Sequence, residues 1–227
     1  MDIKVQDTNY KVFIHDKGTK LISGLLFSKK FNPDYIFLLD ADDWVHKEVV
    51  EHLHSQPSYP VWYVDCGYLV NYKSKERKRK HGMVRYCGST FAYQPSFLMK
   101  LGDMKFEINE TTSQDQLLSS TSDRFIYDIL GNHSIGYHLF PKMGFRPKPF
   151  PMRAITWVCE TGQNVSRSSG GMNGLPIDRK YCDLFGIPET FISSNDADFI
   201  VKIREILGCI RSKITWTQSK ITGQNKY

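Results

Sequence analysis

The sequence predicts an α/β fold in which a sheet is flanked by helices, and three observations lead to this prediction. An apolar run at residues 35–39 is short enough for a buried strand, and it ends in acidic residues. Strand-like and helix-like stretches follow one another along the rest of the chain. Apolar residues make up 41% of the 227 residues, which suffices for the core of a single domain.

The amino-terminal quarter contains elements that are bounded by turn residues. Residues 10–15 are expected as a short strand, and Thr19 as the N-cap of a helix over residues 20–30. An Asn-Pro pair ends this helix ahead of the acidic strand. A further helix is predicted at residues 44–53, directly after the acids.

Extended structure is expected to resume at residues 61–65. Residues 67–72 and 83–86 are predicted to form a hairpin around a basic loop at residues 73–80. The elements predicted next are a helical turn at 96–101, one or two helices within 113–130, an irregular Pro-rich crossing at 145–151 and a strand at 154–159. Residues 166–174 are rich in Ser and Gly, which is typical of a flexible loop. Apolar residues three and four apart indicate an amphipathic closing helix over residues 196–210.

Asp40, Asp42 and Asp43 stand where the apolar run ends. Ionised carboxylates are costly in a core, so they should emerge at the end of the strand, where open α/β sheets bind ligands. Alternation along a strand aims Asp40 and Asp42 the same way. Two carboxylates side by side suit Mn²⁺ or Mg²⁺, and through the metal a diphosphate. The alternative is that the acids cap the following helix.

The net charge of +6 comes largely from the run Lys73 to Lys80 and from the carboxyl-terminal tail. Such a balance could favour nucleic acid, an anionic membrane or a phosphorylated substrate, whereas a solvated hairpin loop is the simpler interpretation. We expect no nucleic-acid partner, and the run could give peripheral membrane contact.

The cysteine pattern and the hydropathy bear on compartment. The five cysteines are widely spaced and contain no C-x-x-C pair, so neither a zinc site nor a disulfide framework is indicated. With no signal peptide and no apolar run long enough to cross a bilayer, a cytoplasmic protein is expected.

Three stretches resemble known enzymes. Residues 20–26 with 34–43, which end in DYIFLLDADD, are similar to the centre of GT-A-fold glycosyltransferases, most closely the bacterial family-two-like enzymes. Residues 67–68 with 86–90, and 148–151 with 161–166, resemble one bacterial subgroup, so the match spans roughly residues 20–170. The resemblance implies a GT-A-like, Rossmann-related central mixed sheet. It places a core at 1–165, a loop or lid at 166–174 and a helical segment of the same domain at 175–227.

The resemblance also implies an activity, namely transfer of a sugar from a nucleotide-diphosphate sugar to a hydroxyl of a glycan or lipid-linked acceptor. Asp42 would be the direct ligand of Mn²⁺ or Mg²⁺, with Asp40 nearer the ribose or a metal-bound water. Asp43 could be a second ligand or an N-cap. A histidine often completes the metal shell in this fold, and the candidates are His133, which we favour, and His138.

Further candidates cover the donor and the acceptor. Gly88, Ser89 and Thr90 resemble the sugar-contacting loop of the subgroup, although a tight turn closing the hairpin would explain them equally well. A general base needs a carboxylate in a cleft, and the candidates are Asp123, Asp128, Glu110 and Asp115. Arg167 on the predicted lid could reach the diphosphate, unless residues 166–174 are only a linker.

One departure from the family pattern keeps other functions open. Glycosyltransferases of this kind carry two βα units before the acidic strand, but only about 34 residues precede it here. Either the amino terminus is missing or the nucleotide pocket is incomplete. The alternatives are a degenerate, non-catalytic GT-A-like binding domain and a nucleotidyltransferase, although the latter class usually shows a Gly-rich phosphate loop that this chain lacks.

Overall fold

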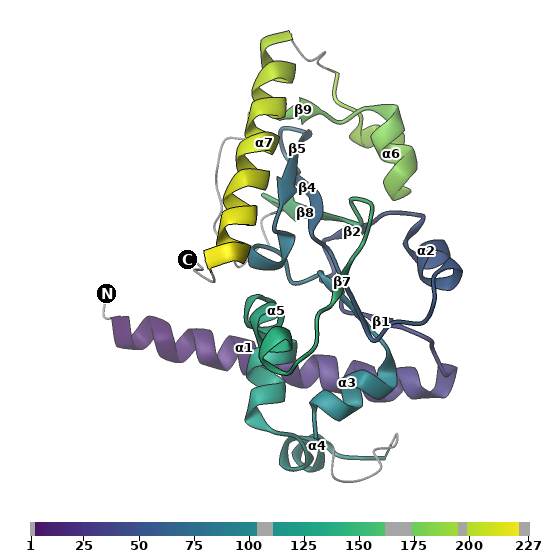
Figure 1. The fold of residues 1–227 in the computed structure, drawn as a ribbon, viewed down its shortest axis with the longest axis vertical. Coiled ribbons are helices and arrows are strands. Elements are labelled where there is room, and N and C mark those ends of the chain that lie inside the picture. The colour runs from purple at the N-terminus through teal and green to yellow at the C-terminus, as the bar shows by residue number, and fades with distance from the viewer. Residues whose placement is uncertain (1–2, 104–110, 162–173, 195–198, 223–227) are drawn as a thin grey trace. The chain divides into compact units, whose positions relative to one another are not determined.

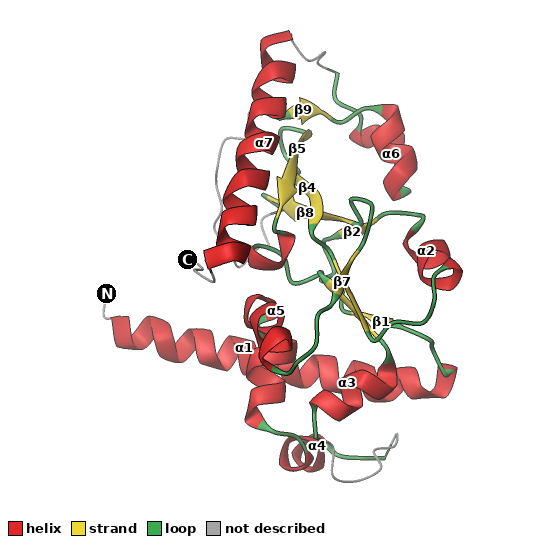
Figure 2. Ribbon diagram, in the orientation of Figure 1, coloured by secondary structure: helices red, strands yellow, loops and turns green. Residues whose placement is uncertain are grey.

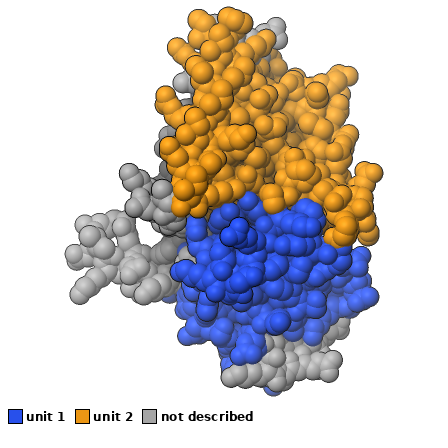
Figure 3. All heavy atoms as spheres, viewed as in Figure 1, with its two compact units in different colours: residues 1–38, 58–63, 90–148 blue, residues 39–57, 64–89, 149–227 orange. Residues whose placement is uncertain are grey.

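The computed structural model describes residues 3–103, 111–161, 174–194 and 199–222 (Figure 1). The chain divides into two compact units, each assembled from separate segments (Figure 3). Unit 1 consists of Met1–Leu38, Ser58–Tyr63 and Thr90–Lys148, and unit 2 of Leu39–Pro57, Val64–Ser89 and Pro149–Tyr227. Helices and strands are mixed throughout (Figure 2). The prediction of an α/β fold is therefore confirmed, but the described residues form two sheets where one was expected.

Unit 1 is mainly helical around a four-stranded sheet of order β1-β6-β3-β7. Its strands are β1 (Ile36–Phe37), β3 (Val61–Tyr63), β6 (Phe91–Tyr93) and β7 (Lys148–Pro149), the last of which ends in unit 2. Its helices are α1 (Ile3–Ser28), η1 (Lys29–Phe31), α3 (Pro95–Leu101), α4 (Gln114–Ser120), the π-helix η3 (Phe125–Gly131) and α5 (His133–Lys142).

Helix α1 packs closely on η3 because two glycines stand at the crossing. A Cβ atom at Gly18 would lie 2.5 Å from the carbonyl oxygen of Ile126, and one at Gly131 would lie 2.6 Å from that of Ile14. The backbones can therefore approach only where a side chain is absent. Ile22, also on α1, is fully buried.

Unit 2 is built on a five-stranded sheet of order β2-β8-β4-β5-β9, in which β4 and β8 are parallel and the other pairs antiparallel. Its strands are β2 (Trp44–Val45), β4 (Cys66–Asn71), β5 (Glu76–His81), β8 (Ile155–Cys159) and β9 (Leu175–Pro176). Its helices are α2 (Val49–Ser55), η2 (Met83–Arg85), α6 (Arg179–Phe185), η4 (Glu189–Phe191) and α7 (Phe199–Thr222).

Helix α6 and helix α7 cover different parts of this sheet. Tyr181 and Phe185 of α6 pack with Tyr68 and Val70 of β4 and with Val158 of β8 in one apolar cluster. Helix α7 instead runs alongside β5 and β9 (Figure 1). One apolar cluster of unit 2 therefore lies under α6, whereas α7 packs on other strands of the sheet.

Several elements match their predictions. The strands at 61–63 and 155–159 lie within the expected ranges, and the helices at 95–101 and within 114–131 differ from the expected ranges of 96–101 and 113–130 by no more than one residue at either end. Local signals explain this agreement, because Pro95 opens α3 and Ser113 with Gln116 forms a capping box at the start of α4. The predicted loop at 166–174 lies almost wholly outside the described residues.

Three predictions at the start of the chain were wrong. Residues 10–15 are not a strand but part of α1, where packing on η3 overrides their β-branched character. The segment after the acids begins with the short strand β2, and α2 starts only at Val49. The acidic strand itself ends at Phe37, earlier than expected.

The basic run was also assigned wrongly. Most of it forms β5, which pairs with β4 on one side and β9 on the other, so the expected solvated loop is a central strand. Arg77 pairs with Asp178 at 2.6 Å and Arg79 with Glu205 at 3.4 Å, so acids distant in sequence compensate the charge. Met83–Arg85 is a 3₁₀ helix rather than the returning strand.

The closing helix exists and is longer than predicted. It runs to Thr222, but most of its apolar residues, although not Trp216, are exposed, contrary to what an amphipathic closing helix implies.

Candidate functional site

The acidic segment is held in place by Asp43, whose side chain is buried in unit 2. Its Oδ2 accepts hydrogen bonds from the Ser89 hydroxyl at 2.6 Å and from the Cys87 thiol at 3.0 Å. Its Oδ1 accepts the backbone N–H of Val158, on β8, at 3.2 Å. Three parts of the chain that are far apart in sequence therefore meet at one carboxyl group.

Ser89 links this anchor to the rest of the acidic segment. Its hydroxyl oxygen accepts the N–H of Asp40 at 2.7 Å while it donates to Asp43. The N–H of Asp43 in turn donates to the carbonyl of Asp40 at 3.1 Å, which closes a turn over residues 40–43. Asp40 and Asp42 are half-buried on that turn.

This geometry contradicts two of the arguments made for the acids, while the metal-ligand interpretation of Asp40 and Asp42 stays a prediction. The alternation argument fails because Asp40 and Asp42 stand on a turn rather than on a strand. The N-cap interpretation also fails, since the residue at the N-cap of α2 is Glu48. Asp43 serves as an internal hydrogen-bond acceptor, a role that the sequence did not suggest.

The environment of Asp43 changes its ionisation. Burial raises the pKa of this carboxyl to about 6, against the lowering effect of hydrogen bonds from Cys87, Ser89 and Val158. The same pocket raises the pKa of the Cys87 thiol through burial and the nearby Asp43, so the thiol stays protonated and donates. Because the pKa of Asp43 exceeds its unfolded value, its contribution to stability is present at low pH and is lost as pH rises through about 6.

The predicted sugar-contacting residues lie in the same stretch of chain. Gly88 is half-buried, while Ser89 and Thr90 are fully buried. Residues 72–75 connect the paired strands β4 and β5, so Gly88–Thr90 are not a turn that closes this hairpin and lead into β6 instead. The Thr90 hydroxyl has no hydrogen-bond partner within the part of the chain that is described.

The other predicted residues belong to unit 1 or lie outside the described residues. Asp123 is exposed just before η3, and Asp128 is half-buried within it. Asp115 is exposed on α4, and His138 lies on α5 against Tyr137, with ring centroids 5.3 Å apart. His133 begins α5, but its side chain is outside the described part, as are Arg167 and Glu110.

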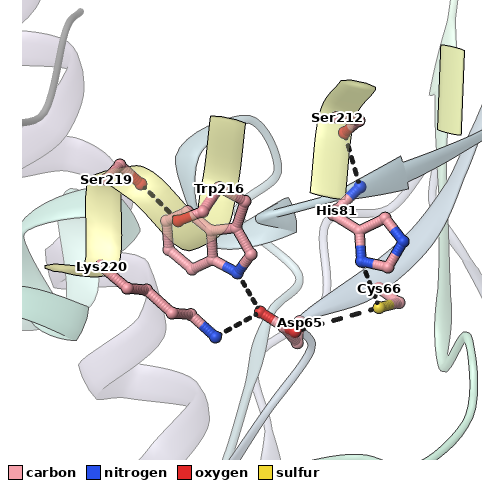
Figure 4. A network of polar contacts seen from close by, with 7 residues as sticks. All are labelled: Asp65, Cys66, His81, Ser212, Trp216, Ser219 and Lys220. Carbon is pink, nitrogen blue, oxygen red and sulfur yellow. Dashed lines mark hydrogen bonds and ion pairs between the residues drawn. The ribbon is translucent and has the colours of Figure 1, made fainter. Parts of the chain in front are cut away.

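A second polar cluster, which the sequence analysis missed, joins Asp65, Cys66 and His81 (Figure 4). The Cys66 Sγ lies 2.9 Å from His81 Nδ1 and 3.9 Å from Asp65 Oδ2. Among the described residues this is the one group of at least three metal-ligating side chains whose ligand atoms all lie within 4.8 Å of one another. The signal was weak because His81 directly follows the basic run.

The protonation states of Cys66 and His81 determine which of them donates the hydrogen bond. Burial raises the pKa of Cys66 to about 11 and lowers that of His81, so a neutral thiol donates to a neutral imidazole. A metal bound here would have to displace that thiol proton. Asp65 is already engaged, because its Oδ1 accepts from the Trp216 indole N–H and pairs with Lys220 at 3.1 Å.

A basic pocket of about 270 Å³ lies between β5 and α7. Its cationic lining residues are Lys78, Arg79, Lys80, Arg85 and Arg211, joined by the polar side chains of Tyr86, Ser212 and Thr215. The lining contains no acid, so an anion is the ligand class that its charge favours.

Comparison of the chain with protein-family models, with curated proteins and with solved structures found no match. None of the helices in the described part of the chain combines the length and the apolar character needed to span a bilayer.

Proposed function

We propose that the chain is a metal-dependent glycosyltransferase that moves a sugar from a nucleotide-diphosphate sugar to a hydroxyl of a glycan or lipid-linked acceptor. One observation carries the proposal. The Asp43 carboxyl bonds the acidic turn to Cys87 and Ser89 and to Val158 of β8. Two of the stretches that resemble glycosyltransferases, those that end at residues 43 and 90, thus meet at one carboxyl group. In sequence, β8 lies between residues 148–151 and 161–166, the two parts of the third stretch.

The roles of the three acids follow from this anchor. Asp43 fixes the turn and is turned inward, so it is a positioning residue rather than a metal ligand. Asp40 and Asp42 remain as hard oxygen ligands on a turn that two hydrogen bonds to Ser89 hold in shape. Such a pair fits Mn²⁺ or Mg²⁺, which would neutralise the charge that develops on the leaving diphosphate.

The remaining roles in the reaction belong to other predicted residues of the chain. Transfer requires a base that takes the proton of the acceptor hydroxyl, and Asp123 and Asp128 are the candidates for it. Asp128 is the more sheltered of the two, whereas Asp123 is exposed. Ser89 serves the anchor, which leaves Gly88 and the Thr90 hydroxyl as candidates for contact with the sugar.

The test is nucleotide binding measured by calorimetry. We expect the wild-type chain to bind a nucleoside diphosphate, drawn from UDP, GDP and ADP, in the presence of Mn²⁺ and not in the presence of EDTA. Asp42→Asn should weaken this binding by more than about tenfold. Mutation of residues that only support metal ligands typically costs at least that much, and Asp42 is proposed as a ligand itself. Asp183→Asn, at an exposed acid of α6, is the matched control and should bind like wild type.

Two outcomes would reject the proposal in different ways. A chain that binds none of the nucleotides with Mn²⁺ is a degenerate domain or has another ligand. A chain that binds a nucleotide, but whose Mn²⁺ complex releases no nucleoside diphosphate from the matching nucleotide sugar when acceptors are supplied, is a binding module. Inorganic diphosphate formed from a nucleoside triphosphate and a sugar phosphate would instead indicate a nucleotidyltransferase.

A further inference from the structure

Helix α7 turns its apolar residues away from the protein. The residues Phe199, Ile200, Ile203, Ile206, Leu207, Ile210, Ile214 and Ile221, which we call the apolar stripe, are between 41% and 80% exposed. Their spacing of mostly three and four residues places them on one side of the helix. A continuous exposed apolar face of this kind is unusual on a monomeric protein and marks an interaction surface.

The opposite side of α7 is polar, and it is the side that packs. Glu205 and Trp216 are each 2% exposed, and Glu205 pairs with Arg79 of β5. Ser212 accepts the backbone N–H of His81 at 3.1 Å, also on β5. An ordinary surface helix is arranged the other way round, with its apolar side inward.

The Asp65 cluster fixes the rotation of the helix about its axis. Figure 4 shows Trp216 and Lys220 of α7 converging on Asp65, where the indole N–H donates and the ammonium group pairs at 3.1 Å. Turning the stripe inward would break these contacts and bury Lys202 and Arg211 without compensation. The outward direction of the stripe is therefore built into the packing of unit 2.

Cationic residues border the apolar stripe on both sides. By helical spacing, Lys202 and Lys213 flank one edge, and Arg204 and Arg211 the other; all four are exposed. The single acid of the helix, Glu205, is on the packed side. The basic pocket between β5 and α7 shares Arg211 with this second edge.

Charge decides between the two natural occupants of such a face. A second copy of α7 would place cationic edges against cationic edges, and no exposed acid of the helix would compensate their charge. This repulsion disfavours pairing of two copies through α7. A bilayer that contains anionic lipid offers acyl chains for the stripe and phosphates for its edges. We propose that α7 lies in the plane of an anionic lipid surface, with the apolar stripe at the boundary between head groups and acyl chains.

The details of the helix fit this mode of binding. In-plane helices combine a strongly apolar side with Lys and Arg at its borders, whose long side chains reach back to the lipid phosphates. The basic pocket beside Arg211 offers further cations at the level of the head groups. The inference rests on α7 and its contacts within unit 2, and it does not require the proposed glycosyl transfer.

The experiment is co-sedimentation of the full chain with vesicles of phosphatidylcholine, with or without phosphatidylglycerol. We expect binding to the phosphatidylglycerol vesicles, weakened by high salt, and little binding to phosphatidylcholine alone. Ile210→Glu, in the middle of the stripe, should weaken vesicle binding at least tenfold. Val50→Glu is the matched control, since it places the same charge at a 64% exposed apolar residue of α2, and it should bind like wild type.

Several results would overturn the inference. Wild-type chain that stays in the supernatant with phosphatidylglycerol vesicles rejects it directly, whatever the variants do. Ile210→Glu that sediments like wild type removes the stripe from the contact. Light scattering that shows a dimer, lost in Ile210→Glu, with no sedimentation on vesicles would make a second copy the occupant.

Discussion

The two long helices near the ends of the chain use apolar residues in opposite ways. Helix α1 of unit 1 buries Ile14, Ile22 and Leu25, and it crosses η3 at two glycines. Helix α7 of unit 2 buries Glu205 and Trp216 and leaves the apolar stripe exposed. A helical hydrophobic pattern thus shows that two faces differ, but it does not show which face is inside.

Partners for polar groups account for the difference. Asp65 of unit 2 presents a carboxylate to α7, and β5 presents Arg79 and a backbone N–H, so polar side chains of α7 find partners at the contact. On α1 the contact is made by apolar side chains and by backbone at the two glycines, and such groups are stabilised by close packing. Polar contacts fix the orientation of α7, and packing fixes that of α1.

The largest effect should come from the buried face of α1. Ile22→Ala removes a fully buried side chain, so we expect the free energy of unfolding to fall by about 2–5 kcal/mol. Urea denaturation measures this. As the control, Gly24→Ala on the same helix places a methyl group in open space and should raise stability by about 0.5–1 kcal/mol. An unchanged free energy of unfolding in Ile22→Ala would contradict the claim that apolar packing holds α1 in place.

An intermediate effect is expected at the polar contact of α7. Trp216→Phe keeps an aromatic ring but removes the N–H that donates to Asp65, so stability should fall by about 1–3 kcal/mol. Hydrogen exchange should also become faster along α7 and not along α1. Equal acceleration in both helices would mean that Trp216 is a general core residue rather than the anchor of one helix.

The smallest effect is expected on the stripe. Ile206→Gln replaces a half-exposed side chain with a polar one, and we expect stability to change by no more than about 0.5 kcal/mol in either direction. Thermal unfolding of the chain in lipid-free buffer measures this. A loss as large as that of Ile22→Ala would show that the stripe is packed within the protein, and the contrast between the helices would vanish.

The sequence predicted elements whose causes are local. The helix at 95–101 opens on Pro95, and the capping box of Ser113 and Gln116 starts α4. The strand β8 was also expected, because a short apolar run bounded by turn residues is typical of a buried strand. The sequence also singled out residues 40–43 and 87–90, and the structure joins these two segments through Asp43 and Ser89.

What the sequence could not predict depends on partners far along the chain. The run of Lys and Arg in β5 has low strand propensity, yet β4 pairs with it and Asp178 and Glu205 compensate its charges. Which of the three acids turns inward depends on Cys87, Ser89 and Val158. Asp65 likewise finds a hydrogen-bond donor in Trp216, 151 residues away.

The interleaving of the two units has a consequence for biosynthesis. The chain passes from one unit to the other after residues 38, 57, 63, 89 and 148, so neither unit is a continuous segment. During translation, unit 1 can close as soon as Lys148 has left the ribosome. The hairpin of β4 and β5 obtains its parallel neighbour only after β8 has been synthesised. Helix α7, which packs on β5, is synthesised later still. A ribosome that stalls between these points would expose an incomplete sheet, a natural target for chaperones.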